Sequence, residues 1–500
     1  MLLLQPPVLA AATAGGAAWY VWSCLASPLW KVPGPWYSAF TSLVLRYREL
    51  RAERTTYIHQ LHLQYGPAVR ISPNEVAFAS VESIKEIYAS GGNQFYDLFM
   101  VYGRRTMFST LVKDDHAKRK RILADRYANT NVQRAAAIDG IHERAGRFLD
   151  RCTASVGKSI DIFVSILINL HNYAFDCVSH HLFHPYGSDS LRNPQDEEIQ
   201  KQVTFDDSLQ NRLIKHHYPT IHRAMGSVIA LFASPRETPL ADELVLSAAS
   251  RSDPARFTVV NRMQEKAHGL DQTTIAAECL DHMAAGIDTT GDALCFLMWE
   301  LSQPRSMAVQ RRLQQELREN KSRLVSPGES GGGAEQQQQQ PKRFDELPYL
   351  DAVVMEGLRC FPAIPMSLPR YVPRGGRTID GYFVPGGAVV SCQAYSTHRI
   401  DQDVFPEPEV FRPERWFAGE HEMERKKLFF AFANGGRGCI GKHLALAEMK
   451  ILLQEIYSRF TTLPDYTCMS DEDMAMADQI ISSQPRAKKC LLTMVPIDVE

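Results

Sequence analysis

One long stretch of apolar residues, 273–303, constrains the fold of this 500-residue chain more than any other feature. Its apolar side chains fall nearly all round a helix, and Pro304 ends it. Because such a helix must be covered on every side, the stretch predicts burial through the middle of the molecule, where it forms the backbone of the fold. The chain can supply that cover, since 45% of its residues are hydrophobic and 22% are charged.

Charge and cysteine content exclude two classes of protein. The formal net charge is −2, from 55 basic and 57 acidic residues, which argues against a nucleic-acid binder. Ten cysteines are scattered without a CxxC pair, so we expect reduced thiols and neither a zinc site nor a disulfide framework.

The first 30 residues carry no charged side chain, and 8–29 is apolar or small. That length is just enough to cross about 30 Å of hydrocarbon, so we predict a transmembrane helix that anchors the chain. A cleaved signal peptide is the alternative, but no basic residue precedes the stretch, whereas Lys31 and several arginines follow it. The expected division is an anchor over 1–30 and one large domain over 31–500.

Turn residues divide the rest of the chain. The segment KVPGPW at 31–36 predicts a stiff exit from the anchor, because proline fixes the backbone. Glycine and glutamine over 326–343 predict a disordered loop insertion. Asp-Gly and Pro-Gly-Gly punctuation over 378–390 predicts a small sheet of hairpins.

The segment FFAFANGGRGCIG at 429–441, followed by an amphipathic helix over 442–458, carries the clearest chemistry. Its glycines let the backbone approach a flat ligand, and Cys439 stands at a helix N-terminus, where the dipole favours a thiolate that can ligate iron. Phe432 is placed to shield the sulfur, and Arg437 to pair a carboxylate. Taken together, F-x-x-G-x-R-x-C-x-G, with Gly441 as its last residue, resembles the haem-binding signature of the cytochrome P450 family.

A second part of the resemblance lies in residues 349–360, where Glu356 and Arg359 share one helix face. Their apolar neighbours indicate burial, so a second arginine is expected to complete the network, and Arg415 in FRPERW at 411–416 supplies it. The pattern is similar to the family's E-x-x-R and P-x-R-F pair, with Trp416 in place of the usual Phe. The implied role is structural.

The long helix contains the sequence AGIDTTG at 285–291, an unfavourable helix sequence because it has two glycines and two threonines. It is similar to the family's A-G-x-D-T-T motif. The resemblance implies an opened helix turn beside haem, with Thr289 as a hydroxyl donor to dioxygen and Asp288 as the acid that resupplies protons.

Haem carries two propionates that need cationic or donor partners. The candidates are His116 and Lys120, one turn apart on a helix, with Arg370 and Arg437. The family commonly has Arg where this chain has Lys120, so that role could pass to Arg119 or Arg121. If the fold is right, basic residues near the Cys439 side form a docking patch for an acidic electron donor: Lys118, Arg119, Arg121, Arg126, Lys426, Lys427 and Lys442.

The resemblance implies a cytochrome P450 fold, mostly α with a minor β region, that binds one haem b with Cys439 as axial ligand of the iron. It also implies a monooxygenase that oxidises a lipophilic small molecule. The implied substrate contacts lie at 95–107, at Met283 and Ala284, at 363–366 and at 479–482.

The chain looks most like fungal microsomal P450s of secondary metabolism. The resemblance implies a monomer at the endoplasmic reticulum membrane with its catalytic domain in the cytosol. Electrons would come from NADPH through NADPH-cytochrome P450 reductase, with cytochrome b5 as a second candidate donor.

Two other functions stay open. A P450-fold isomerase or dehydratase would use haem without external electrons, although Asp288 and Thr289 favour oxygen activation. A non-enzymatic haem carrier or sensor would need the axial ligand of the iron but not the proton relay through Asp288 and Thr289.

Overall fold

The computed structural model describes residues 6–89, 92–163, 169–204, 208–234, 237–322, 341–417 and 419–497. Their α-helices are α1 (Pro6–Ala26), α2 (Leu43–Leu50), α3 (Arg54–Tyr65), α4 (Val81–Ile87), α5 (Lys113–Tyr127), α6 (Asn129–Val132), α7 (Ala135–Ala154), α8 (Leu170–Phe183), α9 (Pro194–Val203), α10 (Leu209–His217), α11 (Pro219–Ile229), α12 (Pro239–Ser250), α13 (Val259–Met263), α14 (Gln272–Ser302), α15 (Met307–Ser322), α16 (Pro348–Cys360), α17 (Ala394–Thr397), α18 (Glu422–Leu428) and α19 (Lys442–Tyr457). The 3-10 helices are η2 (Pro28–Lys31), η3 (Trp36–Ala39), η4 (Gln94–Phe99), η5 (Lys266–His268), η6 (Pro304–Ser306), η7 (Phe344–Glu346), η8 (Pro413–Trp416) and η9 (Gly435–Arg437). The strands are β1 (Ala68–Ser72), β2 (Glu75–Phe78), β3 (Ser159–Asp161), β4 (Arg370–Tyr371), β5 (Arg377–Ile379), β6 (Tyr382–Val384), β7 (Val389–Cys392), β8 (Phe460–Pro464), β9 (Met476–Asp478), β10 (Ser483–Pro485) and β11 (Leu491–Pro496).

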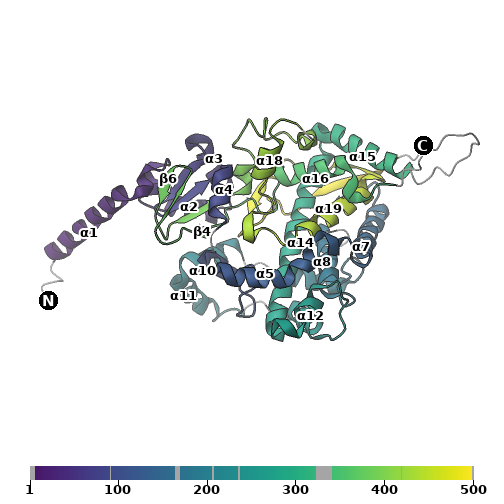
Figure 1. The fold of residues 1–500 in the computed structure, drawn as a ribbon, viewed down its shortest axis with the longest axis horizontal. Coiled ribbons are helices and arrows are strands. Elements are labelled where there is room, and N and C mark those ends of the chain that lie inside the picture. The colour runs from purple at the N-terminus through teal and green to yellow at the C-terminus, as the bar shows by residue number, and fades with distance from the viewer. Residues whose placement is uncertain are drawn as a thin grey trace, which may run out of the picture.

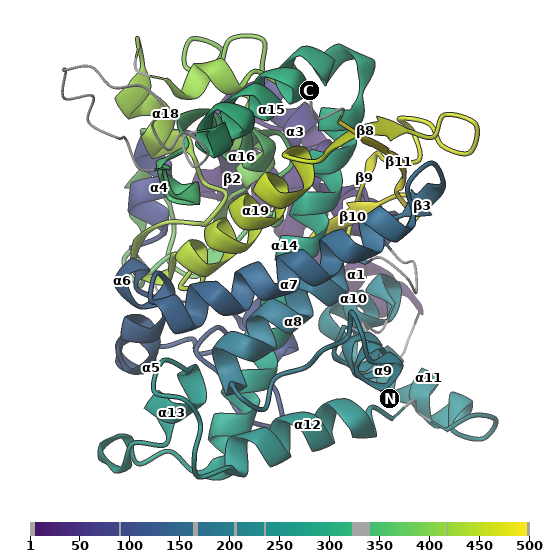
Figure 2. The ribbon, with the colours of Figure 1, turned by 90° about the vertical axis from the view of Figure 1, so that its right-hand side faces the viewer.

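The fold is built around α14, which runs through the middle of the helical part of the molecule (Figure 1). Every residue from 290 to 302 is buried, as the all-round apolar pattern predicts. In the perpendicular view α7 and α8 lie across α14, and α12 lies near one of its ends (Figure 2). The mostly helical fold with a minor β region is confirmed.

The part of the β region that contains β4 and β6 lies on the side of the molecule that carries α1 (Figure 1). Its main sheet has the strand order β1-β2-β7-β4, with β2 and β7 parallel and the other two pairs antiparallel. The hairpin predicted over 378–390 forms between β5 and β6, and Asp380 and Gly381 at its turn have φ values of +49° and +79°. A second sheet of order β3-β11-β8 joins the end of the chain to the helical part.

The predicted stiff exit at 31–36 is fastened to β1. Arg70 donates its backbone N–H to the Pro33 carbonyl at 2.7 Å, and its guanidinium donates to the Leu29 carbonyl at 3.0 Å. A Cβ on Gly34 would come within 2.5 Å of the Arg70 carbonyl oxygen, so only glycine fits this approach. The segment is therefore held on the sheet.

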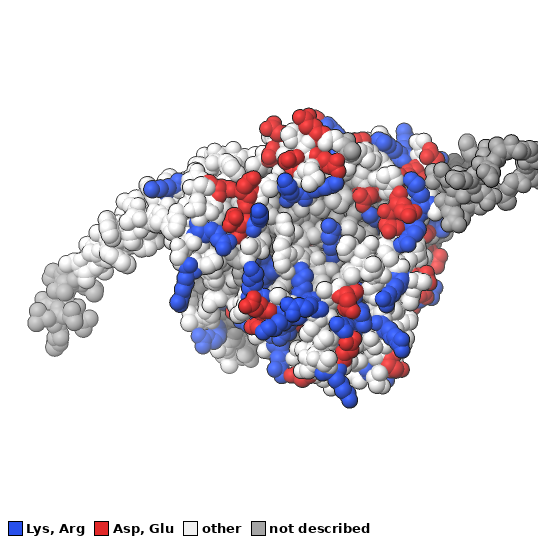
Figure 3. Space-filling model, in the orientation of Figure 1, with Lys and Arg blue, Asp and Glu red and all other residues white. Residues whose placement is uncertain are grey.

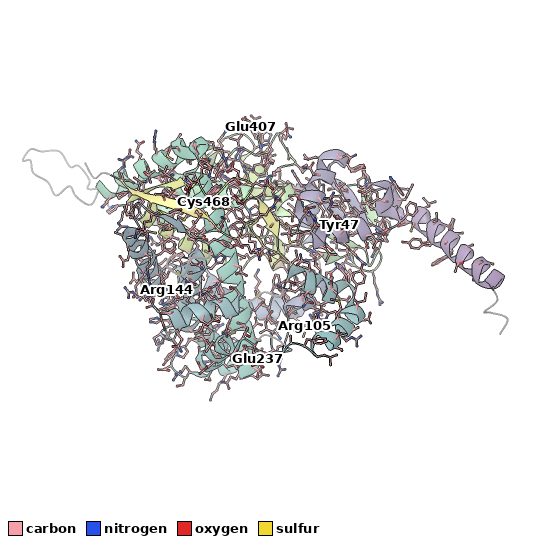
Figure 4. All side chains as sticks on the ribbon, turned by 180° about the vertical axis from the view of Figure 1, so that it is seen from behind. Tyr47, Arg105, Arg144, Glu237, Glu407 and Cys468 are labelled. Atoms are coloured by element: carbon pink, nitrogen blue, oxygen red, sulfur yellow. The ribbon has the colours of Figure 1, made fainter. Side chains whose placement is uncertain are left out.

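The prediction of a spanning anchor over residues 1–30 needs correction. A helix does form, since α1 extends away from the body with its side chains in the open (Figure 4). Among the described residues, however, no helix is both long and apolar enough to cross a membrane. The physical reason is composition, because α1 is rich in alanine and contains Gly15 and Gly16. Of the predicted loop at 326–343, residues up to 340 lie outside the described part of the chain.

Candidate active site

A cavity of about 730 Å³ lies between the middle of α14 and the loop 429–441. Asp288 and Thr289 line it from α14, while Phe432, Cys439 and Gly441 line it from the loop. The side chain of Cys439 is open to this cavity although it lies deep within the protein. The structure thus brings together the two segments that the sequence marks as chemical.

The loop fixes the direction of the cysteine. The Cys439 N–H donates to the Phe432 carbonyl at 2.8 Å, and Gly438 N–H donates to the Gly435 carbonyl at 3.0 Å. Gly435 has a φ of +67°, and a Cβ there would lie 2.8 Å from the Tyr88 carbonyl oxygen. The glycines are thus required by the turn and by its approach to Tyr88.

The electrostatics at Cys439 only partly match the sequence prediction. Burial raises the pKa of its thiol, while the backbone N–H groups of Gly441 and Lys442 and the charge of Lys120 act to lower it. The helix N-terminus therefore opposes the cost of burying a thiolate without removing it.

Four basic side chains gather near one edge of the cavity: His116, Lys120, Arg370 and Arg437. In the described chain their hydrogen bonds go to carbonyl oxygens and to the Tyr96 hydroxyl, and Nε of Arg370 is buried without a partner. Burial and three neighbouring cations, Arg437, Lys120 and Arg370, lower the pKa of His116 to about 4. Burial and Arg370 lower the pKa of Arg437 to about 10. A cluster of cations that repel one another is suited to binding an anionic group. Together with the open thiol of Cys439, the cluster fits haem with its two propionates.

The structure shows where Lys120 and its two alternatives, Arg119 and Arg121, lie. Its ammonium donates to the carbonyls of Gly436 and Gly438, at 3.0 and 2.6 Å, so it holds the Cys439 loop. Arg119 pairs with Glu278 of α14 at 2.7 Å, and Arg121 is exposed on α5. His116, Arg370 and Arg437 line the cavity, whereas Lys120, Arg119 and Arg121 do not.

The motif at 285–291 lies in an unbroken helix, so the expected opened turn is absent from α14. The Thr289 hydroxyl donates to the Ala285 carbonyl at 2.6 Å, which is the local competition that threonine introduces in helices. The glycines serve helix packing instead. A Cβ on Gly286 would lie 2.8 Å from a Val178 methyl, and one on Gly291 would lie 2.7 Å from the His171 ring, both on α8.

The predicted network around Glu356 is present and completely buried. Arg359 and Arg415 donate to its carboxylate at distances of 2.8 to 2.9 Å, and so does the Trp416 indole N–H at 2.9 Å. Burial opposes ionisation, but the two arginines prevail and lower the pKa of Glu356. Tryptophan at 416 therefore adds a donor that phenylalanine would lack.

His398 connects this network to the cysteine loop, and the sequence analysis missed it. Its Nδ1 lies 3.0 Å from the Arg359 carbonyl, and its Nε2 accepts from the Phe430 N–H at 2.7 Å. Burial lowers the pKa of His398 to about 3, which keeps the ring neutral, as these two hydrogen bonds require.

The sequence analysis missed Glu448, and it included Tyr96 only as part of the predicted substrate segment 95–107. Tyr96 lies under both arginines, with guanidinium-to-ring distances of 5.1 Å for Arg370 and 5.9 Å for Arg437. Glu448 of α19 lines the cavity and accepts from the Thr290 hydroxyl at 3.3 Å, and burial raises its pKa to about 8. A carboxylate among the apolar residues of 442–458 was the available signal for Glu448.

The predicted substrate segments mostly border the cavity. Lining residues come from 95–107, from Ala284, from Ala363 and Ile364, and from 480–482, whereas Met283 is not among them. The lining also includes polar side chains of α9, α10 and α12 that sequence reasoning did not identify, such as Arg212.

Comparison with known proteins agrees with this geometry. The family model of cytochrome P450 matches residues 32–491, the span that encloses the cavity and the cysteine loop. The chain belongs to the cytochrome P450 family. It is therefore a monooxygenase-type oxidoreductase whose family uses haem iron and electrons from a redox partner.

Fungal relatives of this P450 match along nearly their whole length. Cytochrome P450 monooxygenase stcB of Emericella nidulans is 26% identical over 488 residues, which cover 94% of this chain and 89% of the relative. Cytochrome P450 monooxygenase aflV of Aspergillus parasiticus is 26% identical, with 94% and 92% covered. Cytochrome P450 monooxygenase macH of Penicillium terrestre is 28% identical, with 90% and 88% covered.

Proposed function

We propose that this P450 hydroxylates or otherwise oxidises a lipophilic small molecule of fungal secondary metabolism. One observation carries the proposal: a single cavity joins the thiol of Cys439 to Asp288 and Thr289, with the cluster of basic side chains at its edge. Haem bound there would be held by the Cys439 sulfur and would supply the chemistry of dioxygen activation.

The roles of this chain's own residues follow from their places. His116, Arg370 and Arg437 would bind the propionates, and Lys120 would support them by holding the loop carbonyls. Asp288 and Thr289 would hold and move protons at the cavity wall. The apolar side chains that line the cavity would bind a lipophilic substrate and exclude water.

The experiment is the absorption spectrum of the reduced, carbon-monoxide-bound protein. We expect the red-shifted band of thiolate-ligated haem, and its loss in Cys439→Ala. A band that survives in Cys439→Ala, or that is absent from the wild-type protein, contradicts the assignment. Product formation only when an electron donor is present separates the monooxygenase from an isomerase or dehydratase, and its loss in Thr289→Ala separates it from a haem carrier.

Electron supply from NADPH through NADPH-cytochrome P450 reductase, or through cytochrome b5, is part of the proposal. Basic side chains gather over α5 with acidic ones among them (Figure 3). Four of the seven predicted docking residues are already paired with carboxylates: Lys118 with Asp115, Arg119 with Glu278, Arg126 with Asp125, and Lys426 with Glu422. Arg121 and Lys427, both exposed, together with the half-buried Lys442, would form the reduced docking surface.

We also propose attachment of the monomer to the endoplasmic reticulum membrane, with the catalytic domain in the cytosol. Trp19 and Trp22 on α1 are 67% and 66% exposed. On α11 no residue is buried, and the exposed Ile221, Val228 and Ile229 have no apolar cover. Both helices lie on the same side of the molecule, which supports a common contact with a lipid surface (Figure 1).

A further inference from the structure

A buried ion pair lies behind Asp288, where α14 faces α8. Nε2 of His171 is 3.1 Å from Oδ1 of Asp292, and their side chains are only 11% and 5% exposed. Asp292 follows Asp288 by four residues, so both carboxyl groups lie on one face of the helix. Because Asp288 also lines the cavity, this pair is close to the reaction space without being part of its wall.

The position of the His171 ring is tightly set. The ring lies against the backbone of α14 at Gly291, where a Cβ would come within 2.7 Å of it. Phe163 makes an edge contact with the ring at a centroid distance of 4.9 Å. At the start of α8 the Asn169 side chain accepts from the His171 backbone N–H at 2.8 Å.

The surroundings favour an imidazolium. One side of the ring meets Asp292, and the other meets the backbone carbonyl of Phe163, so both nitrogens face acceptors. Burial alone would lower the pKa of His171, but the hydrogen bond and charge of Asp292 and the charge of Asp288 raise it. The neighbouring His180 and His181 behave in the opposite way, since burial lowers the pKa of each to about 3.

We infer that His171, held by Asp292, is a positioning residue for the oxidation: a buried cation that sets the charge of Asp288 and returns a proton to it. The proton on Nε2 passes by way of Asp292 to the carboxylate of Asp288 after Asp288 has given its own proton toward the cavity. The neutral imidazole then takes a proton from solvent water. The inference rests on the proposed function, in which Asp288 is the acid.

The test compares His171→Gln and Asp292→Asn with His180→Gln in the haem-loaded enzyme. Glutamine at 171 keeps an N–H donor for Asp292 but removes the charge. We expect His171→Gln to lower the product formed per electron consumed by about tenfold and to raise peroxide release and the solvent deuterium isotope effect. Substrate affinity, measured by optical titration, should stay unchanged. His180 lies on the same helix as His171, and its Nε2 contacts the Ala136 carbonyl of α7. His180→Gln is therefore the matched control and should leave all four readouts unchanged.

A second readout does not depend on activity. In the reduced, carbon-monoxide-bound enzyme, nitrogen NMR of labelled histidine should show both His171 nitrogens protonated at neutral pH, and a neutral ring in Asp292→Asn. A neutral ring in the wild-type enzyme overturns the inference, and so does an unchanged product yield in both His171→Gln and Asp292→Asn. If the loaded enzyme oxidises no substrate with any electron donor, the proposed function fails, and the ring spectrum still decides whether the cation exists.

Discussion

At the scale of single residues, the chemistry of this P450 depends on buried polar groups that satisfy one another. The Glu356 carboxylate, for example, accepts hydrogen bonds from two arginines and a tryptophan within a completely buried site. The sequence analysis could predict Glu356, Arg359 and Arg415, because charges among apolar neighbours need partners. It could not predict the role of His398, or the contact of Tyr96 with Arg370 and Arg437, since the partners of both residues come from distant segments.

Glu356→Gln should destabilise the fold severely. It leaves Arg359 and Arg415 buried without their carboxylate, and breaking a buried ion pair costs about 3–5 kcal/mol. Trp416→Phe is the milder control, because it removes one hydrogen bond to a charged group, worth about 1.5 kcal/mol. Urea unfolding measures the free energy of unfolding of both variants. Equal losses of this free energy would contradict the central role of the Glu356 carboxylate.

A pH dependence follows from His181 of α8. Burial lowers its pKa to about 3, from an ordinary value near 6.5. Between those values the unfolded chain binds a proton that the folded chain does not, so stability falls as pH drops below about 6.5. One such histidine costs up to about 1.4 kcal/mol per pH unit. His181→Leu should therefore flatten the slope of unfolding free energy between pH 7 and pH 5, and an unchanged slope would show that His181 is charged in the folded protein.

At the scale of elements, predictions succeeded where a pattern was long and periodic. The stretches expected at 273–303, 349–360 and 442–458 correspond to α14, α16 and α19. The opened turn at 285–291 was wrong for an instructive reason. Glycine weakens a helix in isolation, but Gly286 and Gly291 face α8, which lies over a hundred residues earlier in the chain, and no local pattern reports that contact.

Gly291→Ala tests the packing of α8 on α14. The new methyl group would press on the His171 ring at 2.7 Å, and overpacking of a buried contact costs about 1–3 kcal/mol. The matched control is Gly146→Ala in α7, where a Cβ meets nothing within 4 Å. That change should be neutral or stabilise by up to about 1 kcal/mol. The thermal unfolding temperature should fall in Gly291→Ala and should stay the same or rise in Gly146→Ala. A Gly291→Ala protein as stable as the wild-type protein would contradict the close packing.

At the scale of the whole molecule, the cavity lies between α14 and the loop 429–441, and α1 extends away from the body (Figure 1). Composition alone could exclude a nucleic-acid binder, but it could not predict the cluster of His116, Lys120, Arg370 and Arg437, which form no ion pair with a carboxylate among the described residues. The sequence analysis also overestimated the hydrophobicity of α1, because small residues extend an uncharged stretch without making it strongly apolar.

Removal of residues 1–30 tests the proposed membrane attachment. The shortened protein should bind lipid vesicles at least tenfold more weakly in a sedimentation assay, because the exposed aromatic side chains of α1 are lost. Carbon-monoxide binding serves as the control for an intact cavity. Residual binding should disappear when Ile221 and Val228 of α11 are also changed to serine. Undiminished vesicle binding by the shortened protein would contradict a role for α1.

The link between α1 and the body has a dynamic consequence. Arg70 holds the carbonyls of the segment that leaves α1, and the Tyr20 hydroxyl donates to the Phe40 carbonyl at 2.5 Å. Because these hydrogen bonds fasten both α1 and the segment that follows it to the body, α1 and the sheet should rotate as one body. A fluorescent probe on α1 would then lose its polarisation at the slow tumbling rate of the entire protein, and Arg70→Ala would add a fast component to that decay.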